Sequence, residues 1–172
     1  DTLSTGKAPY PFRFQGIDDT SLKVKKRIFE YRLKYNGHND KFVVCYCLNN
    51  LFEIYNSDGS LHKRIIAPYP YLVDTNHLSA DKLGVPIDEL IFTFKDCCLT
   101  DDRIFLLYNG SSPTGMIGAQ SKIYVFDYEG NPIKYYLLDR YAHSFCIDKQ
   151  GGVIYALSDE NDQKQVVRYS ML

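Results

Sequence analysis

Two apolar segments joined by a short polar turn, residues 121–138 (SKIYVFDYEGNPIKYYLL), constrain the fold of this chain more than any other stretch. Apolar side chains fill successive positions of the first segment, so a strand there would be buried on both faces. Gly130 can adopt a positive φ in the turn, and Pro132 can begin an edge strand without losing a ladder hydrogen bond. The stretch therefore predicts an antiparallel hairpin that is packed on both sides.

Related segments recur along the chain, which indicates a repeated structural unit. The aligned pairs are 52–55 with 123–126, 166–169 with 123–126, 97–100 with 145–148, and 103–107 with 152–156. In the first pair the alignment extends across the turn, where Gly59 falls on Gly130. Most of these spacings fit one four-stranded propeller blade of about 40–50 residues.

The repeats predict an all-β fold, a β-propeller of about three four-stranded antiparallel blades that form part of a six-bladed ring. The predicted single domain covers 1–172, with blades at approximately 20–67, 89–139 and 142–172 and an insertion at 67–88. A sandwich or an open antiparallel barrel of short strands is the alternative. The third blade would lack its fourth strand, because Leu172 falls on Glu129, at the turn before that strand.

Composition and charge exclude several function classes. With 45% hydrophobic residues and a net charge of -1, the chain suits an ordinary globular protein that has no general attraction to nucleic acids or anionic membranes. The basic segment 22–33 predicts an inner strand or strand pair, with a short helix as the rival, and a nucleic-acid patch there is disfavoured. No apolar run is long enough for a transmembrane segment.

The five cysteines are expected to be small buried hydrophobic residues. They are Cys45, Cys47, Cys97, Cys98 and Cys146. Their C-x-C and C-C spacings differ from the usual zinc motifs, and the vicinal pair would point to opposite faces of a strand. A disulfide between repeats and metal or redox chemistry are the alternatives.

No motif for a nucleotide, a metal or a hydrolase nucleophile occurs, so the sequence predicts no cofactor and no metal site. The acidic segment 159–162 lacks the spacing of a calcium loop and is expected to be a solvated turn.

The best candidate binding site is the mouth of the propeller channel, which the inner strands would line. His143 is expected to start an inner strand, and Lys95 occupies the equivalent position in the preceding blade. The candidate ligand-binding residues are Lys95, Asp96, Tyr141 and His143, with Tyr69 and Tyr71 of the insertion as further contacts. Non-catalytic binding or scaffolding is the favoured function. A propeller hydrolase or lyase with a metal in the central channel is the alternative, and a purely structural assembly module is a third possibility.

Two stretches resemble a known family. Residues 122–157 (KIYVFDYEGNPIKYYLLDRYAHSFCIDKQGGVIYAL) are similar to the C-terminal half of the TolB-like six-bladed β-propeller proteins of Bacteroidetes, often predicted lipoproteins, and residues 40–65 resemble the preceding blade. The resemblance implies a periplasmic or outer-membrane-attached protein of largely undefined role, with no catalytic motif to carry over.

Three blades do not close a six-bladed ring. We therefore expect a partner, either a missing N-terminal half or a homodimer mate that completes the propeller. Residues 8–16 are a candidate for the outer strand that the third blade lacks. The expected ligand is a protein, peptide or glycan.

Overall fold

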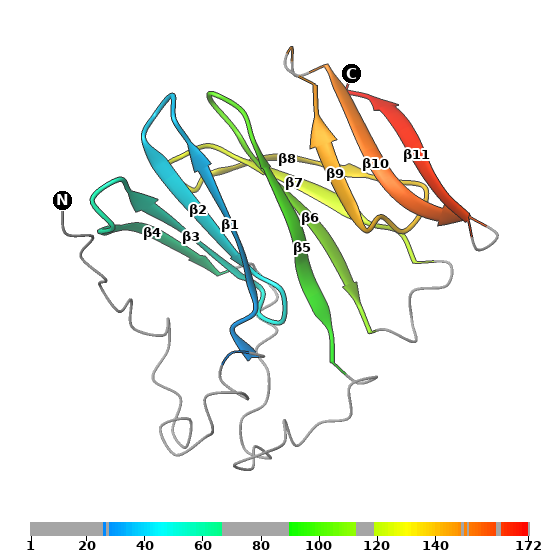
Figure 1. Ribbon diagram of the computed structural model, residues 1–172, viewed down its shortest axis with the longest axis horizontal. Helices are drawn as coiled ribbons and strands as arrows, with labels where there is room; N and C mark the ends of the chain where they lie inside the picture. Colours follow the sequence, from blue (N-terminus) through cyan, green and yellow to red (C-terminus); the bar gives the residue numbers. More distant parts are fainter. Residues whose placement is uncertain are drawn as a thin grey trace.

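The computed structural model describes residues 26, 28–66, 90–112, 119–148, 150, 152–160 and 163–171. Their strands form three antiparallel sheets that lie side by side, and we call these sheets blades one, two and three (Figure 1). Blade one holds β1 (Tyr31–Asn36), β2 (Lys41–Tyr46), β3 (Leu51–Asn56) and β4 (Leu61–Ile66). Blade two holds β5 (Phe92–Leu99), β6 (Ile104–Ser111), β7 (Lys122–Phe126) and β8 (Pro132–Leu137). Blade three holds β9 (Ser144–Ile147), β10 (Val153–Glu160) and β11 (Gln163–Ser170).

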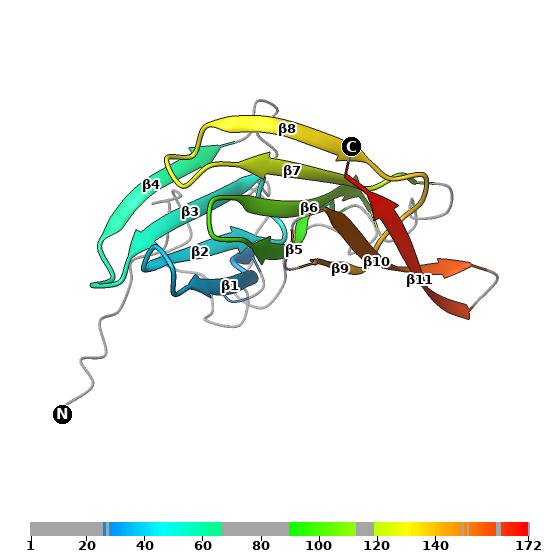
Figure 2. The same ribbon diagram turned by 90° about the horizontal axis from the view of Figure 1, so that it is seen from above.

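Each blade is an up-and-down sheet whose strands follow the chain order. Seen from above, β1, β5 and β9 lie along one side of the stack, and β4 and β8 lie along the other (Figure 2). The inner strands are neighbours, since β5 contacts both β1 and β9. The prediction of an all-β chain with three antiparallel units is confirmed, and blade three has no fourth strand among the described residues.

The prediction for residues 22–33 is partly wrong. The first strand begins only at Tyr31, and the described residues Lys26 and Ile28 have helical backbone, as the rival interpretation expected. Pairing with blade one starts where the Glu30 carbonyl accepts a hydrogen bond from Cys47 N–H at 2.7 Å. The predicted insertion and residues 8–16 lie outside the described residues. Within the part of the chain that the structure describes, no helix is long and apolar enough to cross a membrane.

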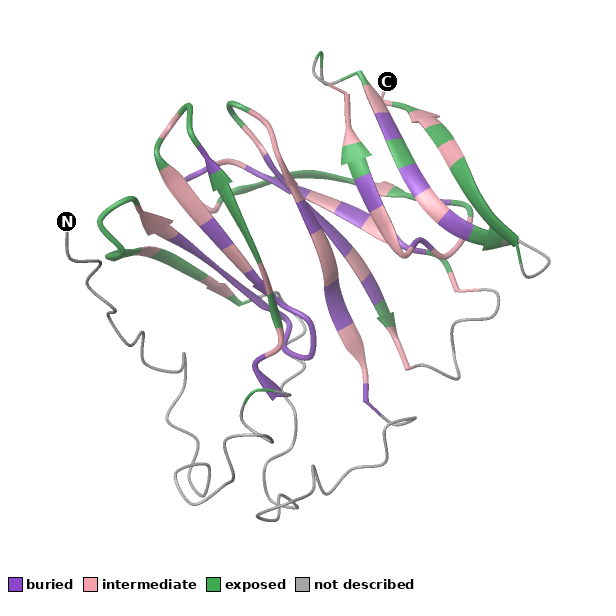
Figure 3. Ribbon diagram, in the orientation of Figure 1, coloured by how far each residue is buried: buried purple, intermediate pink, exposed green. Residues whose placement is uncertain are grey.

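Apolar cores fill the two interfaces between blades. The core between blades one and two contains Val43, Cys45, Phe52, Ile54, Phe94, Cys97, Ile104, Leu106, Phe126 and Tyr128. The core between blades two and three contains Phe105, Leu107, Ile123, Val125, Leu138, Ala142, Phe145, Ile154 and Ala156. Successive residues of β6 thus enter different cores, which explains why the middle strands are apolar at every position. Buried residues accordingly follow β3 and β6, and exposed ones follow the rim strands β4, β8 and β11 (Figure 3).

Buried polar groups also tie the blades together. The Thr93 N–H donates to the Cys47 carbonyl at 2.8 Å, and the Thr93 hydroxyl donates to the Asn49 carbonyl at 2.9 Å. At the next interface Asn109 donates to the Ala142 carbonyl at 3.2 Å, and the Ser121 hydroxyl donates to Asn109 at 2.6 Å. These bonds satisfy backbone groups that would otherwise be buried without partners.

The turns between third and fourth strands confirm the first aligned pair. Gly59 and Gly130 have positive φ values of 82° and 78°. Each donates its N–H to the residue three positions earlier, Asn56 or Asp127, at 3.0 and 3.1 Å. The pairing register shifts at equivalent places, between Ile54 and Tyr55 in blade one and between Val125 and Phe126 in blade two.

One alignment is wrong by a single residue. Phe105 pairs with Cys98, and Tyr155 pairs with Cys146, so Phe105 corresponds to Tyr155 and not to Ile154. The turn between β9 and β10 is longer than the turn between β5 and β6, which shifts the second strand relative to the first.

Candidate functional site

The channel-mouth group comprises Lys95, Asp96, Tyr141 and His143, and it lies on or beside the inner strands β5 and β9. Lys95 and Asp96 occupy the part of β5 where the pairing register with β6 shifts. Tyr141 and His143 lie just before β9. All four side chains are partly exposed. The two tyrosines of the insertion, Tyr69 and Tyr71, lie outside the described residues.

Asp96 joins two blades. One carboxylate oxygen accepts a hydrogen bond from Cys97 N–H at 2.9 Å, and the other accepts one from Phe145 N–H at 3.3 Å. Phe145 belongs to β9, so this carboxylate bridges the inner strands of blades two and three. The residue that it binds on β9, Phe145, follows His143 by two positions in the sequence.

His143 precedes its strand by one residue, because β9 begins at Ser144. Its N–H donates to the Leu157 carbonyl at 2.8 Å, and its Nε2 lies 2.7 Å from Asp159 Oδ2. The expectation that Asp159 belongs to a solvated turn is wrong: it lies in β10 and anchors the imidazole. With the corrected alignment, Asp159 corresponds to Asn109, which binds the neighbouring Ala142 carbonyl.

Tyr141 packs edge-on against the His143 ring, with centroids 5.0 Å apart and planes at 74°. Burial raises the pKa of the Tyr141 phenol. The phenol thus stays protonated, but its hydroxyl is buried. Tyr141 therefore offers ring surface for stacking, and the partly exposed His143 supplies the polar atoms of the site.

Lys95 points to a different neighbourhood. Its ammonium lies 5.1 Å from the Phe92 ring centroid, a cation–π distance. Its charge also opposes the rise that burial causes in the pKa of Cys47, which lies just after β2 of blade one and has a pKa of about 11. The structure therefore pairs Tyr141 with His143 and binds Asp96 to the same strand, β9, at the Phe145 backbone, whereas Lys95 lies on the side of blade one.

The described residues do not assemble a metal centre. In the ranges that the structure covers, no three His, Cys, Asp or Glu side chains are arranged to hold a metal ion. His143 and Asp159 form a pair, and Lys164 approaches the second oxygen of Asp159 at 3.8 Å. This lysine gives the pair a cationic neighbour.

A cavity that the sequence did not indicate lies between blades two and three, near the β5–β6 and β9–β10 turns. Its volume is about 730 Å³, and its lining includes Arg103, Lys134, Tyr136, Asp148 and Met171. The equivalent space between blades one and two is occupied by the β7–β8 turn, where Tyr128 is buried and Gly130 lies against Lys63 and Ile65. The cavity thus occupies the position that the turn to a fourth strand of blade three would fill.

Comparisons with known proteins agree with this architecture. A solved member of the DUF4221 family from Bacteroides vulgatus is similar in structure, with a TM-score of 0.54 and 7% sequence identity. The match covers 83% of this chain and 46% of that protein, so the chain spans about half the length of this relative. A putative 6-phosphogluconolactonase from Bacteroides fragilis is more distant, with a TM-score of 0.40, 13% identity, and coverage of 80% and 36%. That second likeness is too weak to support an inference.

No curated protein matches the sequence. Residues 4–150 match the family described as TolB-like 6-blade propeller-like. This match covers most of the chain and agrees with its three antiparallel sheets. The chain belongs to the TolB-like six-bladed propeller family.

Proposed function

We propose that this chain is a non-catalytic binding or scaffold part of a propeller, and that its ligand contacts the channel-mouth group. The observation that carries the proposal is the pairing of Tyr141 with His143 beside an inner strand, with His143 held by Asp159. The His143 side chain remains 30% exposed, so its ring is both fixed and accessible. Aromatic faces with nearby charged groups suit a protein, peptide or glycan ligand.

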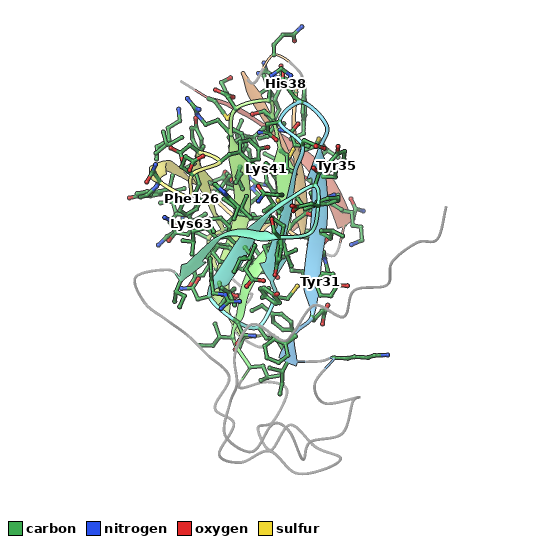
Figure 4. The ribbon with its side chains drawn as sticks, turned by 90° about the vertical axis from the view of Figure 1, so that its left-hand side faces the viewer. Tyr31, Tyr35, His38, Lys41, Lys63 and Phe126 are labelled. Atoms are coloured by element: carbon green, nitrogen blue, oxygen red, sulfur yellow. The ribbon has the colours of Figure 1, made fainter. Side chains whose placement is uncertain are left out.

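Exposed apolar side chains on both outer faces of the three-blade stack support the proposal of a partner that completes the ring. On blade one, Tyr31, Leu33 and Tyr35 are 55%, 52% and 53% exposed. They pair with Tyr46, Val44 and Phe42, so all six share one face, and Figure 4 looks onto this side of the molecule. We call it the open face of blade one. In the middle of the stack, such faces are buried between blades.

Blade three has a comparable open face. Tyr155 and Val166 are 37% and 69% exposed, whereas the equivalent Phe105 and Ile123 of blade two are buried. Large apolar patches of this kind mark interaction surfaces. The partner is either a preceding half of the propeller or a second copy of the chain.

A sequence repeat favours the preceding half. Residues 8–11 and 67–70 are both APYP, and the second copy directly follows β4. The sequence ahead of blade one therefore shares a motif with the sequence that follows β4. This similarity supports a further blade ahead of blade one in the same polypeptide.

The proposed location is the periplasm or the outer membrane surface, supported by the resemblance to predicted lipoproteins of Bacteroidetes. Cell fractionation of the native protein, with and without inhibition of lipoprotein processing, would test this location.

The binding proposal can be tested with two defined probes, a random dodecapeptide phage library and a glycan array. Each hit would be titrated against the unmodified chain, His143→Ala and Tyr141→Ala, with His62→Ala as the matched control on β4. We expect the two site variants to weaken binding by at least ~10-fold, as is typical for the central residues of an interface, and the control to leave it unchanged. Equal binding by all variants, or no hit with either probe, would contradict the proposal.

A further inference from the structure

β11 is the outermost described strand of blade three, whereas blades one and two each continue into a fourth strand. Among the described residues β11 pairs with β10 alone, and its equivalents β3 and β7 are each paired on both sides. Met171 N–H donates to the Gly152 carbonyl at 3.0 Å, and the β10–β11 register continues from there without a shift. Hydrogen-bonded pairs alternate along an antiparallel ladder. The backbone groups that point to the free edge therefore include those of Lys164, Val166 and Arg168.

The side chains of these three residues form a pattern of one apolar residue between two basic ones. They pair with Asp159, Leu157 and Tyr155 of β10, so all three lie on the open face of blade three. The side chain of Lys164 and the residue Val166 are each 69% exposed. An added strand with acidic residues opposite the two basic ones and an apolar residue opposite Val166 would match this pattern. Pairing between two β11 edges would instead set basic residues against each other.

The cavity between blades two and three can receive the turn that leads into such a strand. At the equivalent place between blades one and two, a Cβ atom at Gly130 would lie 2.8 Å from Ile65 and 3.3 Å from Lys63. The pairing registers make Lys134 the equivalent of Lys63, and Tyr136 the equivalent of Ile65. Both of these blade-two residues line the cavity. The surface that holds a turn at one interface is thus repeated at the other.

The outer strand that the sequence suggests within the chain itself fits this edge poorly. Residues 11–14 (PFRF) resemble the start of β8, residues 132–135 (PIKY). In that alignment Arg13 takes the place of Lys134, which in the register of blade two would set it opposite Arg168. Like charges directly opposite each other destabilise a strand pair.

We propose that the free edge of β11 and the adjoining cavity bind an extended acidic peptide segment of another protein, which adds a fourth strand to blade three. In such strand addition, main-chain hydrogen bonds supply affinity and alternate side chains supply specificity. β10 separates β11 from the inner strand β9, so this site is distinct from the channel-mouth group. The inference therefore does not depend on the ligand proposed for that group.

The chain itself provides a probe. A labelled peptide of residues 129–138 (EGNPIKYYLL) covers the end of the β7–β8 turn and all of β8, and carries Lys134→Glu and Leu138→Glu. In the register of blade two, the two substituted positions lie opposite Arg168 and Lys164. We expect fluorescence anisotropy to show binding to the full chain that is about 10-fold tighter than that of the unsubstituted peptide, because acidic residues replace a basic and an apolar one beside the basic residues of β11.

N-methylation of the peptide separates strand pairing from simple charge attraction. In the same register the N–H of Tyr136 points to β11, and the N–H of Leu137 points away from it. A methyl group on the Tyr136 nitrogen should therefore abolish binding, and one on the Leu137 nitrogen should largely preserve it. Equal effects of the two methyl groups would overturn the proposal.

A charge reversal on the protein tests the register. Arg168→Glu should reverse the preference, so that the unsubstituted peptide, with Lys134 opposite the new carboxylate, binds better than the acidic one. Lys34→Glu on β1 is the matched control and should leave the preference unchanged, and circular dichroism would confirm that both variants keep their β content. No binding of the acidic peptide to the full chain, an unchanged preference in Arg168→Glu, or binding that appears only after removal of residues 1–25 would overturn the proposal. The last result would show that the edge belongs to the chain's own N-terminal segment.

Discussion

Gly130 in the β7–β8 turn of blade two lies directly against Ile65 on the outer strand of blade one. A Cβ atom at Gly130 would lie 2.8 Å from Ile65 Cδ1 and 2.9 Å from Ile65 Cγ1. The outer strand of blade one thus receives the β7–β8 turn of blade two. Near this contact, His62 of β4 pairs with Glu129 at 3.2 Å.

We expect Gly130→Ala to destabilise the protein more than Gly59→Ala. Both glycines have positive φ, so alanine costs about 1–2 kcal/mol of backbone strain at either position. The Cβ at Gly59 meets nothing within 4 Å, whereas the one at Gly130 must displace Ile65. Overpacking adds about 1 kcal/mol or more. Urea denaturation of both variants measures the difference, and equal losses would show that the contact between these blades is loose.

A buried carboxylate stabilises the open face of blade one. Glu53 has a fully buried side chain and accepts hydrogen bonds from Tyr46 at 2.7 Å, Tyr55 at 2.8 Å and Arg64 at 2.6 Å. Glu53→Gln removes the charge and leaves these donors poorly matched, so we expect a loss of about 3 kcal/mol in the free energy of unfolding. Glu129→Gln, at an exposed ion pair, is the control and should change little. A similar small effect of both substitutions in chemical denaturation would contradict this expectation.

The same cluster predicts alkaline destabilisation. Burial and the hydrogen bond to Glu53 raise the pKa of Tyr55 from 10.0 to about 12. Because the pKa is higher in the folded state, the contribution of the protonated phenol is fully present below pH 10 and is lost as the pH rises toward 12. Unfolding midpoints of the unmodified protein should therefore fall more steeply across this range than those of Tyr55→Phe. Tyr31→Phe, on an exposed strand, should retain the steep fall, and parallel profiles for all three proteins would refute the assignment.

Local signals in the sequence predicted much of the fold. The β7–β8 hairpin follows from the successive apolar residues of its first strand and from Gly130, and the two faces of β5 follow from the adjacent Cys97 and Cys98. The start of β1 was less predictable, because a basic segment with loose alternation suits both a strand and a short helix. The β6–β10 alignment failed by one residue, since short apolar strands match equally well in either register. Such a shift exchanges the faces of every side chain.

The candidate site was only partly visible in the sequence for the same reason. The position of His143 beside an inner strand followed from the repeat. Its partner Asp159 lies on the next strand, and only the correct pairing register places it there. The bridging role of Asp96 depends on the close approach of β5 to β9, which no local pattern encodes.

The exposed faces predict the behaviour of the isolated chain in solution. Because the open face of blade one presents Tyr31, Leu33 and Tyr35 to solvent, we expect the 172-residue chain to self-associate or aggregate in the absence of further blades. Leu33→Glu should shift it toward the monomer. Lys34→Glu is the matched control, because this neighbour pairs with Val43 and lies on the opposite face of β1. Light scattering coupled to size exclusion would measure the mass of each variant, and circular dichroism would confirm its β content. A strictly monomeric, well-folded and soluble unmodified chain would show that the faces need no partner.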